Sequence, residues 1–433
     1  MIAIAYALVA VAAVAFAAVR RGEFRALGDE DRWAAIAVVL VTAWPMVWTF
    51  VLGPVVVGTP ASPLFPAVWY LPGAAMAVLM MRRAFESGAF RVDLPVALAA
   101  AVSVLALAPL LLDGGTFSEL QRWALGAVLL AIPLLKRERV GLPALAWASR
   151  TSLLVIALTV LATATVVPGG VGNCRTDKCG TAGVALTSAF AGNGNILGLS
   201  VALLLPFALV NRRWPQAVSL VVAVLAIGEL AGSRTAMIGV VIVVAMTVGL
   251  RVTPSRRAVL TLGLVGSLML SLLPVLLSYG DEAFSFRGTL WNQAKELIAR
   301  NLVLGEGPAA WERLGANSVY DANYSPHNGW LDMTVSVGVA GVVVIVIALA
   351  LKVFLVHGEE RSTLIVFLCG LLGISTLESL MTPYFLGILP ATPVLALMLG
   401  PGRLLVPRRR RRRISRRHTT DQVEATTIVG SRS

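Results

Sequence analysis

The sequence predicts an all-α polytopic membrane protein. Of its 433 residues, 57% are hydrophobic and only 14% are charged, and the mean hydropathy is +0.82. Runs of about 18 or more apolar residues recur, and each can cross roughly 30 Å of hydrocarbon as a helix. Membrane β-strands alternate apolar and polar residues, whereas these runs are apolar on every side, so strands do not explain them.

Hydropathy and the basic loops predict about 12–13 transmembrane helices within a membrane domain of residues 1–403. A short loop separates most of them, and one large loop covers residues 280–328. The expected spans are 1–19, 33–57, 66–81, 94–112, 122–135, 145–167, 191–210, 215–231, 235–250, 258–279, 329–355, 361–379 and 384–400.

Basic residues alternate between loops and therefore predict the orientation. They concentrate in 20–32, 82–91, 136–139 and 251–257, whereas 58–65 and 113–121 contain none. The positive-inside rule places the basic loops and the C-terminus in the cytoplasm of a multi-pass plasma (inner) membrane protein. The first span has no basic residue before it, so it is expected to remain as a span rather than be cleaved as a signal peptide.

The segment 404–433 is expected to be a disordered cytoplasmic tail, with six consecutive arginines at 408–413. A nucleic-acid-binding arm is one interpretation. A basic segment directly after an apolar helix more often fixes topology against anionic headgroups, so we favour membrane lipids and no nucleic-acid partner.

The large extracytoplasmic loop contains a predicted amphipathic helix at 286–300. Its apolar residues recur at helical spacing, which suits a helix lying along the membrane surface. They are Leu290, Trp291, Ala294, Leu297 and Ile298.

Two of the three cysteines, Cys174 and Cys179, flank a short polar loop on the predicted outer side. A lone pair is too sparse for a structural zinc site, so a disulfide is the better candidate. Cys369 lies within an apolar run and is expected to pack.

Several basic residues on the predicted outer side are exceptions to the positive-inside rule. Arg234 lies in the short turn 232–235 between two apolar runs, so it must lie near the outer interface. Arg287 and Arg300 lie in the large loop. Guanidinium groups bind phosphate oxygens bidentately, and two of them could hold a diphosphate. Arg234 could instead reach lipid headgroups or pair with Glu229.

His327 precedes a predicted span and could take a proton from an acceptor hydroxyl or orient it. Asn193, Asn195 and Asn328 lie at the starts of spans, where they could bind substrate or cap helices. The sequence has no phosphate-binding glycine loop, and its Asp-x-Asp triplet, Asp29-Glu30-Asp31, lies in a predicted cytoplasmic loop rather than with these candidates on the outer face. A soluble-type nucleotide-sugar enzyme or an ATPase is therefore unsupported, and we expect neither a cofactor nor a metal ion.

Three elements occur in an order that resembles the O-antigen ligase and polymerase family (Wzy_C, WaaL-type). The first is Gly-Ser-Arg-Thr-Ala at 232–236. The second is Arg287-x-x-x-Trp291 followed by Leu-Gly-x-Gly at 304–307. The third is His327-Asn328-x-x-Leu331 followed by Gly-x-x-Gly at 338–341. A weaker Phe…Asn element at 190–195 precedes them.

This resemblance implies a GT-C-like fold and a metal-independent, inverting glycosyltransferase. It would move a glycan from a polyprenyl diphosphate-linked donor to an acceptor hydroxyl on a glycan, lipid or protein. Arg234 and Arg287 would bind the diphosphate and His327 would activate the acceptor. Asn193, Asn195, Asn328, Trp291 and Arg300 are further substrate-binding candidates.

Two other classes of function remain open. A membrane transporter of small solutes or lipid-linked intermediates would also have many spans, and it should show broken helices and ionisable residues deep in the bundle. A scaffold predicts that Arg234, Arg287 and His327 can be replaced without loss of function.

Overall fold

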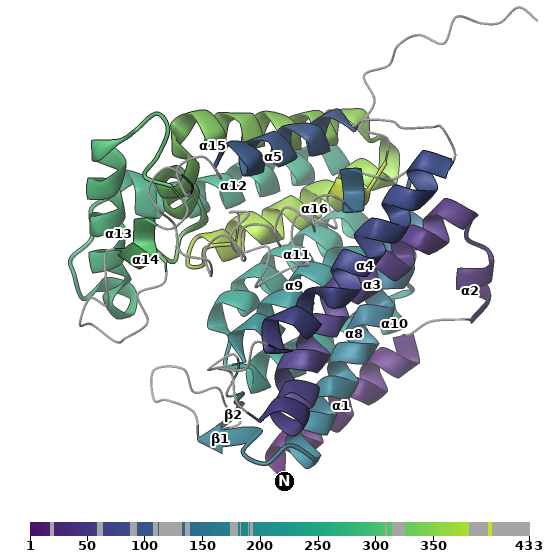
Figure 1. Ribbon diagram of the computed structural model, residues 1–433. Coiled ribbons are helices and arrows are strands. Elements are labelled where there is room, and N and C mark those ends of the chain that lie inside the picture. The colour runs from purple at the N-terminus through teal and green to yellow at the C-terminus, as the bar shows by residue number, and fades with distance from the viewer. Residues whose placement is uncertain are drawn as a thin grey trace, which may run out of the picture.

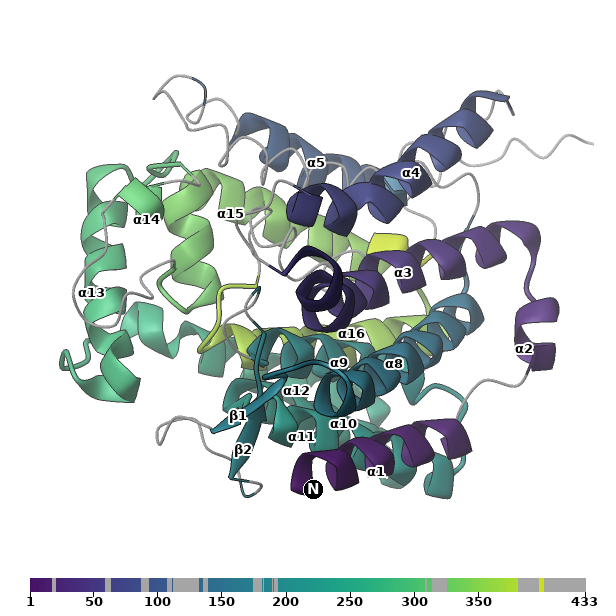
Figure 2. The same cartoon turned by 60° about the horizontal axis from the view of Figure 1, so that its bottom comes forward.

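The computed structural model describes residues 1–17, 21–58, 64–86, 93–106, 111, 132–134, 139–173, 181, 183–188, 190, 194–307, 310–313, 325–380 and 397–400. Within these ranges the regular structure is helical except for one antiparallel hairpin of two short strands, β1 (Val171–Asn173) and β2 (Val184–Leu186). Figures 1 and 2 show α13 and α14 at the left end of the helical bundle, α2 at the right end, and the hairpin near the bottom beside the N-terminal end of α1.

The described helices are α1 (Ile2–Ala17), α2 (Arg21–Arg25), α3 (Asp29–Val47), the π-helical segment η1 (Trp48–Val57), α4 (Leu64–Glu86), α5 (Leu94–Leu105), α8 (Leu142–Thr165), α9 (Asn195–Ala208), α10 (Trp214–Leu230), α11 (Arg234–Val252), α12 (Arg256–Leu276), α13 (Ala283–Arg300), α14 (Ala310–Arg313), α15 (Gly329–Leu355) and α16 (Gly358–Ser375).

These helices confirm the predicted fold class, an all-α polytopic membrane protein. Five of them, with α3 and η1 counted together, are long and apolar enough to cross a membrane, and α1, α5, α9 and α10 are apolar but shorter. Most predicted spans coincide with a described helix. The exceptions are 122–135 and 384–400, which lie almost entirely outside the described residues, as does the basic tail.

Two helices form the centre of the bundle. In α9 every residue from Leu197 to Ala208 is buried, and in α16 every residue from Thr363 to Ser375 is buried. A helix that is apolar on all sides is stable only when protein or lipid surrounds it completely. Packing therefore fixes both helices. The start of α9 and the segment after α16 each contribute a residue to the candidate site described below.

The amphipathic helix of the large loop is present as α13, but its apolar face does not face the membrane. Trp291, Ala294 and Leu297 are buried in a cluster with Trp311 of α14 and Leu331 of α15. The prediction that this face lies on the membrane surface was wrong, because periodicity shows that a face is buried without showing what buries it.

Asp93 and Lys352 form a buried ion pair between α5 and α15. The Lys352 Nζ atom lies 2.9 Å from Asp93 Oδ2, and the two side chains are 0% and 3% exposed. Desolvation of an ion pair opposes its Coulomb attraction, so a buried pair adds little net stability, but removal of one partner leaves an uncompensated charge.

We expect Lys352→Met and Asp93→Asn each to destabilise the protein by about 3–5 kcal/mol, whereas the double variant Asp93→Leu/Lys352→Met should recover much of the loss. Thermal unfolding in detergent measures the effect. Arg82→Ala is the control, because Arg82 pairs with Glu86 at the surface, and it should leave the melting temperature almost unchanged. Equal effects of all four variants would contradict the assignment.

Candidate functional site

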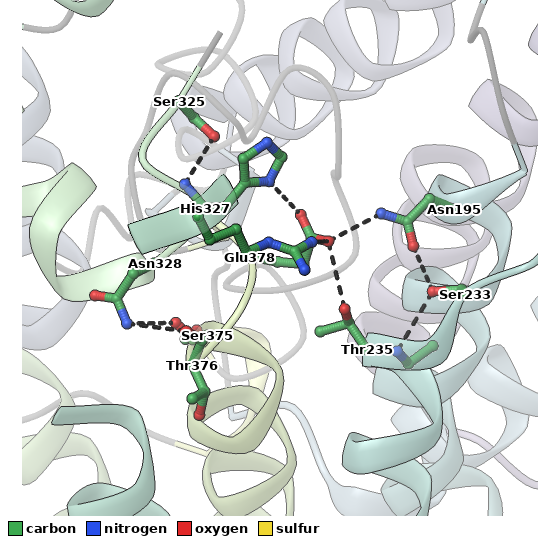
Figure 3. A network of polar contacts seen from close by, with 11 residues as sticks. Asn195, Ser233, Thr235, Ser325, His327, Asn328, Ser375, Thr376 and Glu378 are labelled. Atoms are coloured by element: carbon green, nitrogen blue, oxygen red, sulfur yellow. Dashed lines mark hydrogen bonds and ion pairs between the residues drawn. The ribbon is translucent and has the colours of Figure 1, made fainter. Parts of the chain in front are cut away.

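The carboxylate of Glu378 lies at the centre of a polar cluster (Figure 3). Its Oε1 atom accepts hydrogen bonds from Asn195 Nδ2 at 3.2 Å, Thr235 Oγ1 at 3.4 Å and Arg287 Nη2 at 3.2 Å. Its Oε2 atom lies 3.2 Å from His327 Nδ1. The Glu378 side chain is only 9% exposed. Two of the three residues predicted to be catalytic therefore meet at a single buried acid.

The donors of this cluster come from the beginnings of four helices. Asn195 opens α9, Thr235 follows the first residue of α11, Arg287 lies in the second turn of α13, and His327 lies just before α15. Helix N-termini carry partial positive charge and unpaired N–H groups, and both favour an anion nearby. The site is therefore suited to bind negative charge.

The turn before α11 places Arg234 beside the cluster. The hydroxyl of Ser233 donates to Asn195 Oδ1 and also accepts from the backbone N–H of Ala236, which caps α11. Thr235, on the other side of Arg234, binds Glu378. Arg234 itself is exposed, and its two chain neighbours, Ser233 and Thr235, are buried and hold its position in the turn.

Asn328 is a structural residue rather than a substrate contact. It is 0% exposed, and its Oδ1 atom accepts from the N–H groups of Trp330 and Leu331 at the start of α15. Its Nδ2 atom lies within 3.2 Å of the carbonyl oxygens of Ser271, Ser375 and Thr376. The structure thus gives Asn328 the capping role that the sequence left open, since the polar groups of its side chain hold α15 against α12 and α16.

His327 is held in a strained conformation. Its φ of 50° lies in the left-handed region, which non-glycine residues rarely adopt and which concentrates at functional sites. Its N–H donates to Ser325 Oγ at 3.2 Å. Because an ionised carboxylate only accepts hydrogen bonds, the contact with Glu378 requires a proton on Nδ1. The Nε2 atom of the neutral ring then carries the lone pair.

Glu378 lies beyond the end of α16, and its surroundings favour the ionised form. Burial opposes ionisation, but the carboxylate accepts hydrogen bonds from Asn195, Thr235, Arg287 and His327, and Arg287 also supplies a positive charge. At neutral pH the cluster contains a carboxylate whose charge is compensated by its neighbours.

Sequence reasoning missed Glu378. The available signal was an acidic residue at the end of an otherwise apolar predicted span, 361–379. An ionisable group in such a place is a functional candidate by default. In the sequence, however, the whole of α15 and α16 lies between His327 and Glu378. No local motif connects the two residues.

Two further candidates lie away from the cluster. Trp291 is 1% exposed and packs edge-on against Tyr279, with ring centroids 5.0 Å apart. Arg300 is exposed at the far end of α13, about 20 Å along the helix axis from Arg287 at 1.5 Å per residue. Trp291 therefore belongs to the core and Arg300 lies at the other end of α13 from Arg287, so neither joins the Glu378 cluster, and their substrate-binding roles stay predictions.

Three other predicted residues, Asn193, Cys174 and Cys179, lie outside the described residues. The hairpin of β1 and β2 brackets the cysteine loop. Asn193 precedes Asn195 at the start of α9 by two residues.

Residues 218–346 match the family model described as O-antigen ligase. The match supports an O-antigen ligase- or polymerase-like family. It extends from α10 into α15 and includes Arg234, Arg287 and His327, whereas Asn195 and Glu378 lie outside it. No curated protein matches the sequence significantly.

We expect Asn328→Ala to lower the stability by about 1–3 kcal/mol, because it removes a cap and leaves buried N–H and C=O groups unpaired. Asn328→Asp keeps the capping oxygen but loses the donor and places a negative charge beside three carbonyl oxygens, so it should not restore stability. Thermal unfolding in detergent tests both. Wild-type melting of Asn328→Asp would show that the three carbonyl contacts contribute nothing.

Proposed function

We propose that this chain is a glycosyltransferase that moves a glycan from a polyprenyl diphosphate-linked donor to an acceptor hydroxyl at the outer face of the plasma membrane. The acceptor would be a glycan, a lipid or a protein. The proposal is finer than the O-antigen ligase- or polymerase-type assignment that the family match supports. It rests chiefly on one observation, the convergence of Arg287 and His327 on Glu378.

The charge of the site supports a diphosphate as its ligand. Arg287 is 22% exposed and can reach a ligand at the edge of the cluster. Arg234, which is exposed, lies at the start of α11 between two residues that contact the cluster. Guanidinium groups compensate the charge of a departing diphosphate through fixed hydrogen bonds. In this mechanism the arginines perform the role that a metal ion performs in other glycosyltransferases.

The proposed transfer forms one bond and breaks one bond. The acceptor oxygen attacks the anomeric carbon from the side opposite the diphosphate, so the configuration inverts. The bond from that carbon to the phosphate oxygen breaks, and its electron pair remains on the diphosphate beside Arg234 and Arg287. The acceptor proton passes to Nε2 of His327, which thus acts as a general base.

Glu378 would act on the acceptor through His327. A carboxylate bound to Nδ1–H fixes the tautomer in which Nε2 can accept a proton, and it stabilises the imidazolium that then forms. The same carboxylate holds Arg287 at 3.2 Å. Glu378 is thus a positioning residue for both halves of the reaction.

A transporter is the second candidate, because α15 is interrupted at Gly338 within a candidate membrane span. In transporters the backbone groups freed by such a break bind the substrate or ion. Here the amides of Val339 and Ala340 are occupied by the carbonyls of Leu302 and Val303. These two amides are therefore not available to a substrate or ion, as a transporter site at this break would require.

Glycan transfer in a deletion strain tests the proposal. We expect Arg287→Ala, His327→Ala and Arg234→Ala, at membrane levels matched to wild type, to lose surface glycan and to accumulate the lipid-linked precursor. Glu378→Gln should reduce transfer by roughly 10²–10⁴-fold, because an uncharged amide no longer supports the imidazolium. Normal glycan in every variant would reject the site and favour the transporter or the scaffold.

Two residues of α13 provide matched controls. Glu296→Gln makes the same chemical change as Glu378→Gln at an exposed position, and Arg300→Ala matches Arg287→Ala at the distant end of the helix. Both should retain wild-type transfer. Loss of transfer in Arg300→Ala would show that the diphosphate site extends along α13.

A further inference from the structure

The break in α15 is filled by the turn that follows α13. Gly338 has a φ of 64° and a ψ of 179°, which interrupts the helix. In an unbroken helix the N–H of Val339 would bond to the carbonyl of Val335. Instead, Val339 N–H donates to Leu302 O at 2.9 Å, and Val335 O accepts from Glu306 N–H at 2.8 Å. The turn thus takes the hydrogen-bonding place of one helical turn.

Two glycines allow this contact. A Cβ atom on Gly305 would lie 2.6 Å from the backbone nitrogen of Gly338, and both residues have positive φ. The N–H of Ala340 donates to Val303 O at 3.1 Å. The turn is therefore bound through its backbone, which leaves its side chains to point elsewhere.

Those side chains are large, apolar and exposed. Leu302, Val303 and Leu304 are 53%, 61% and 67% exposed, although the apolar face of the preceding helix α13 is buried in protein. Contiguous exposed apolar surface marks an interaction site. Arg300, which is also exposed, precedes these three residues, with only Asn301 between them.

The lipid-facing surface of α15 begins beside this turn. Residues 329–338 are largely buried, whereas Val339, Val343 and Ile347 are 41%, 47% and 47% exposed on a helix that can span a membrane. Figure 2 shows α13 and α14 against the N-terminal part of α15. The backbone bonds to Val339 and Ala340 make the exposed turn continuous with that surface.

We propose that Leu302, Val303 and Leu304 form a membrane wedge that inserts among the acyl chains of the leaflet on the side of the candidate site. Acyl chains fit because the three side chains extend the lipid-facing surface of α15, and because no charged residue interrupts them between Asn301 and Gly305. Arg300 lies where its guanidinium can reach a lipid phosphate while its stem follows the apolar surface. The wedge anchors α13, and hence the start of that helix, at the membrane interface.

Photo-cross-linking of the full chain in lipid nanodiscs tests the wedge. A benzophenone amino acid replaces Val303 or, in a second variant, Leu304. Neither substitution removes a hydrogen bond of the turn, because those bonds use the backbone. We expect mass spectrometry to detect lipid acyl adducts at both positions, at a yield comparable with the same probe at Val343.

Glu296 supplies the matched negative control, since it is exposed on the same α13 and should give no acyl adduct. Two results would overturn the proposal. One is the lack of lipid adducts at 303 and 304 while Val343 gives them. The other is cross-linking of Val303 to a second copy of the chain, which would make the turn a protein interface.

Discussion

The hydrogen bonds and ion pairs of the Glu378 carboxylate are the contacts on which the candidate site depends. A buried carboxylate is stable only when donors and positive charge surround it. Asn195, Thr235, Arg287 and His327 supply them from four segments far apart in the sequence. Without that anion, the starts of four helices and the Arg287 guanidinium would be directed at one another with nothing between them.

The helices that meet there are fixed by contacts distributed along α15. Asn328 ties its start to α12 and α16. The turn after α13 occupies the break at Gly338, and Lys352 is paired with Asp93 of α5 near the other end. A helix held at both ends and in the middle has little freedom to move.

The sequence was sufficient for the helices and for three members of the cluster, Asn195, Arg287 and His327, because those depend on local signals. Apolar runs predict spans, and Arg287 and His327 stand out as polar residues of motifs at their ends. The roles of Trp291 and Asn328 could not be predicted, since a motif residue can bind substrate or hold the motif together. Glu378 escaped notice for another reason: it belongs to no motif, and its partners are brought to it by the packing of α9 and α16.

The break in α15 illustrates the same limit. Leu-Gly-x-Gly and Gly-x-x-Gly are separated by 30 residues or more in the sequence, yet Gly305 and Gly338 lie in direct backbone contact. A glycine inside an apolar helix is compatible with a continuous span, so hydropathy predicts no interruption there. The donors that satisfy the freed backbone groups come from another segment, and periodicity contains no information about them.

In the proposed mechanism, an anionic diphosphate enters a site that already contains a carboxylate, and the charges must balance. The charge of Arg287 is shared between Glu378 and the ligand, so Arg234 and the positive ends of α9, α11 and α13 add to it at the diphosphate. A site without Glu378 would attract the diphosphate more strongly but would leave the imidazole unoriented. Tighter binding of the ground state does not accelerate transfer, whereas a correctly oriented base lowers the barrier of the transition state. The carboxylate is therefore better explained by the proton transfer than by donor binding.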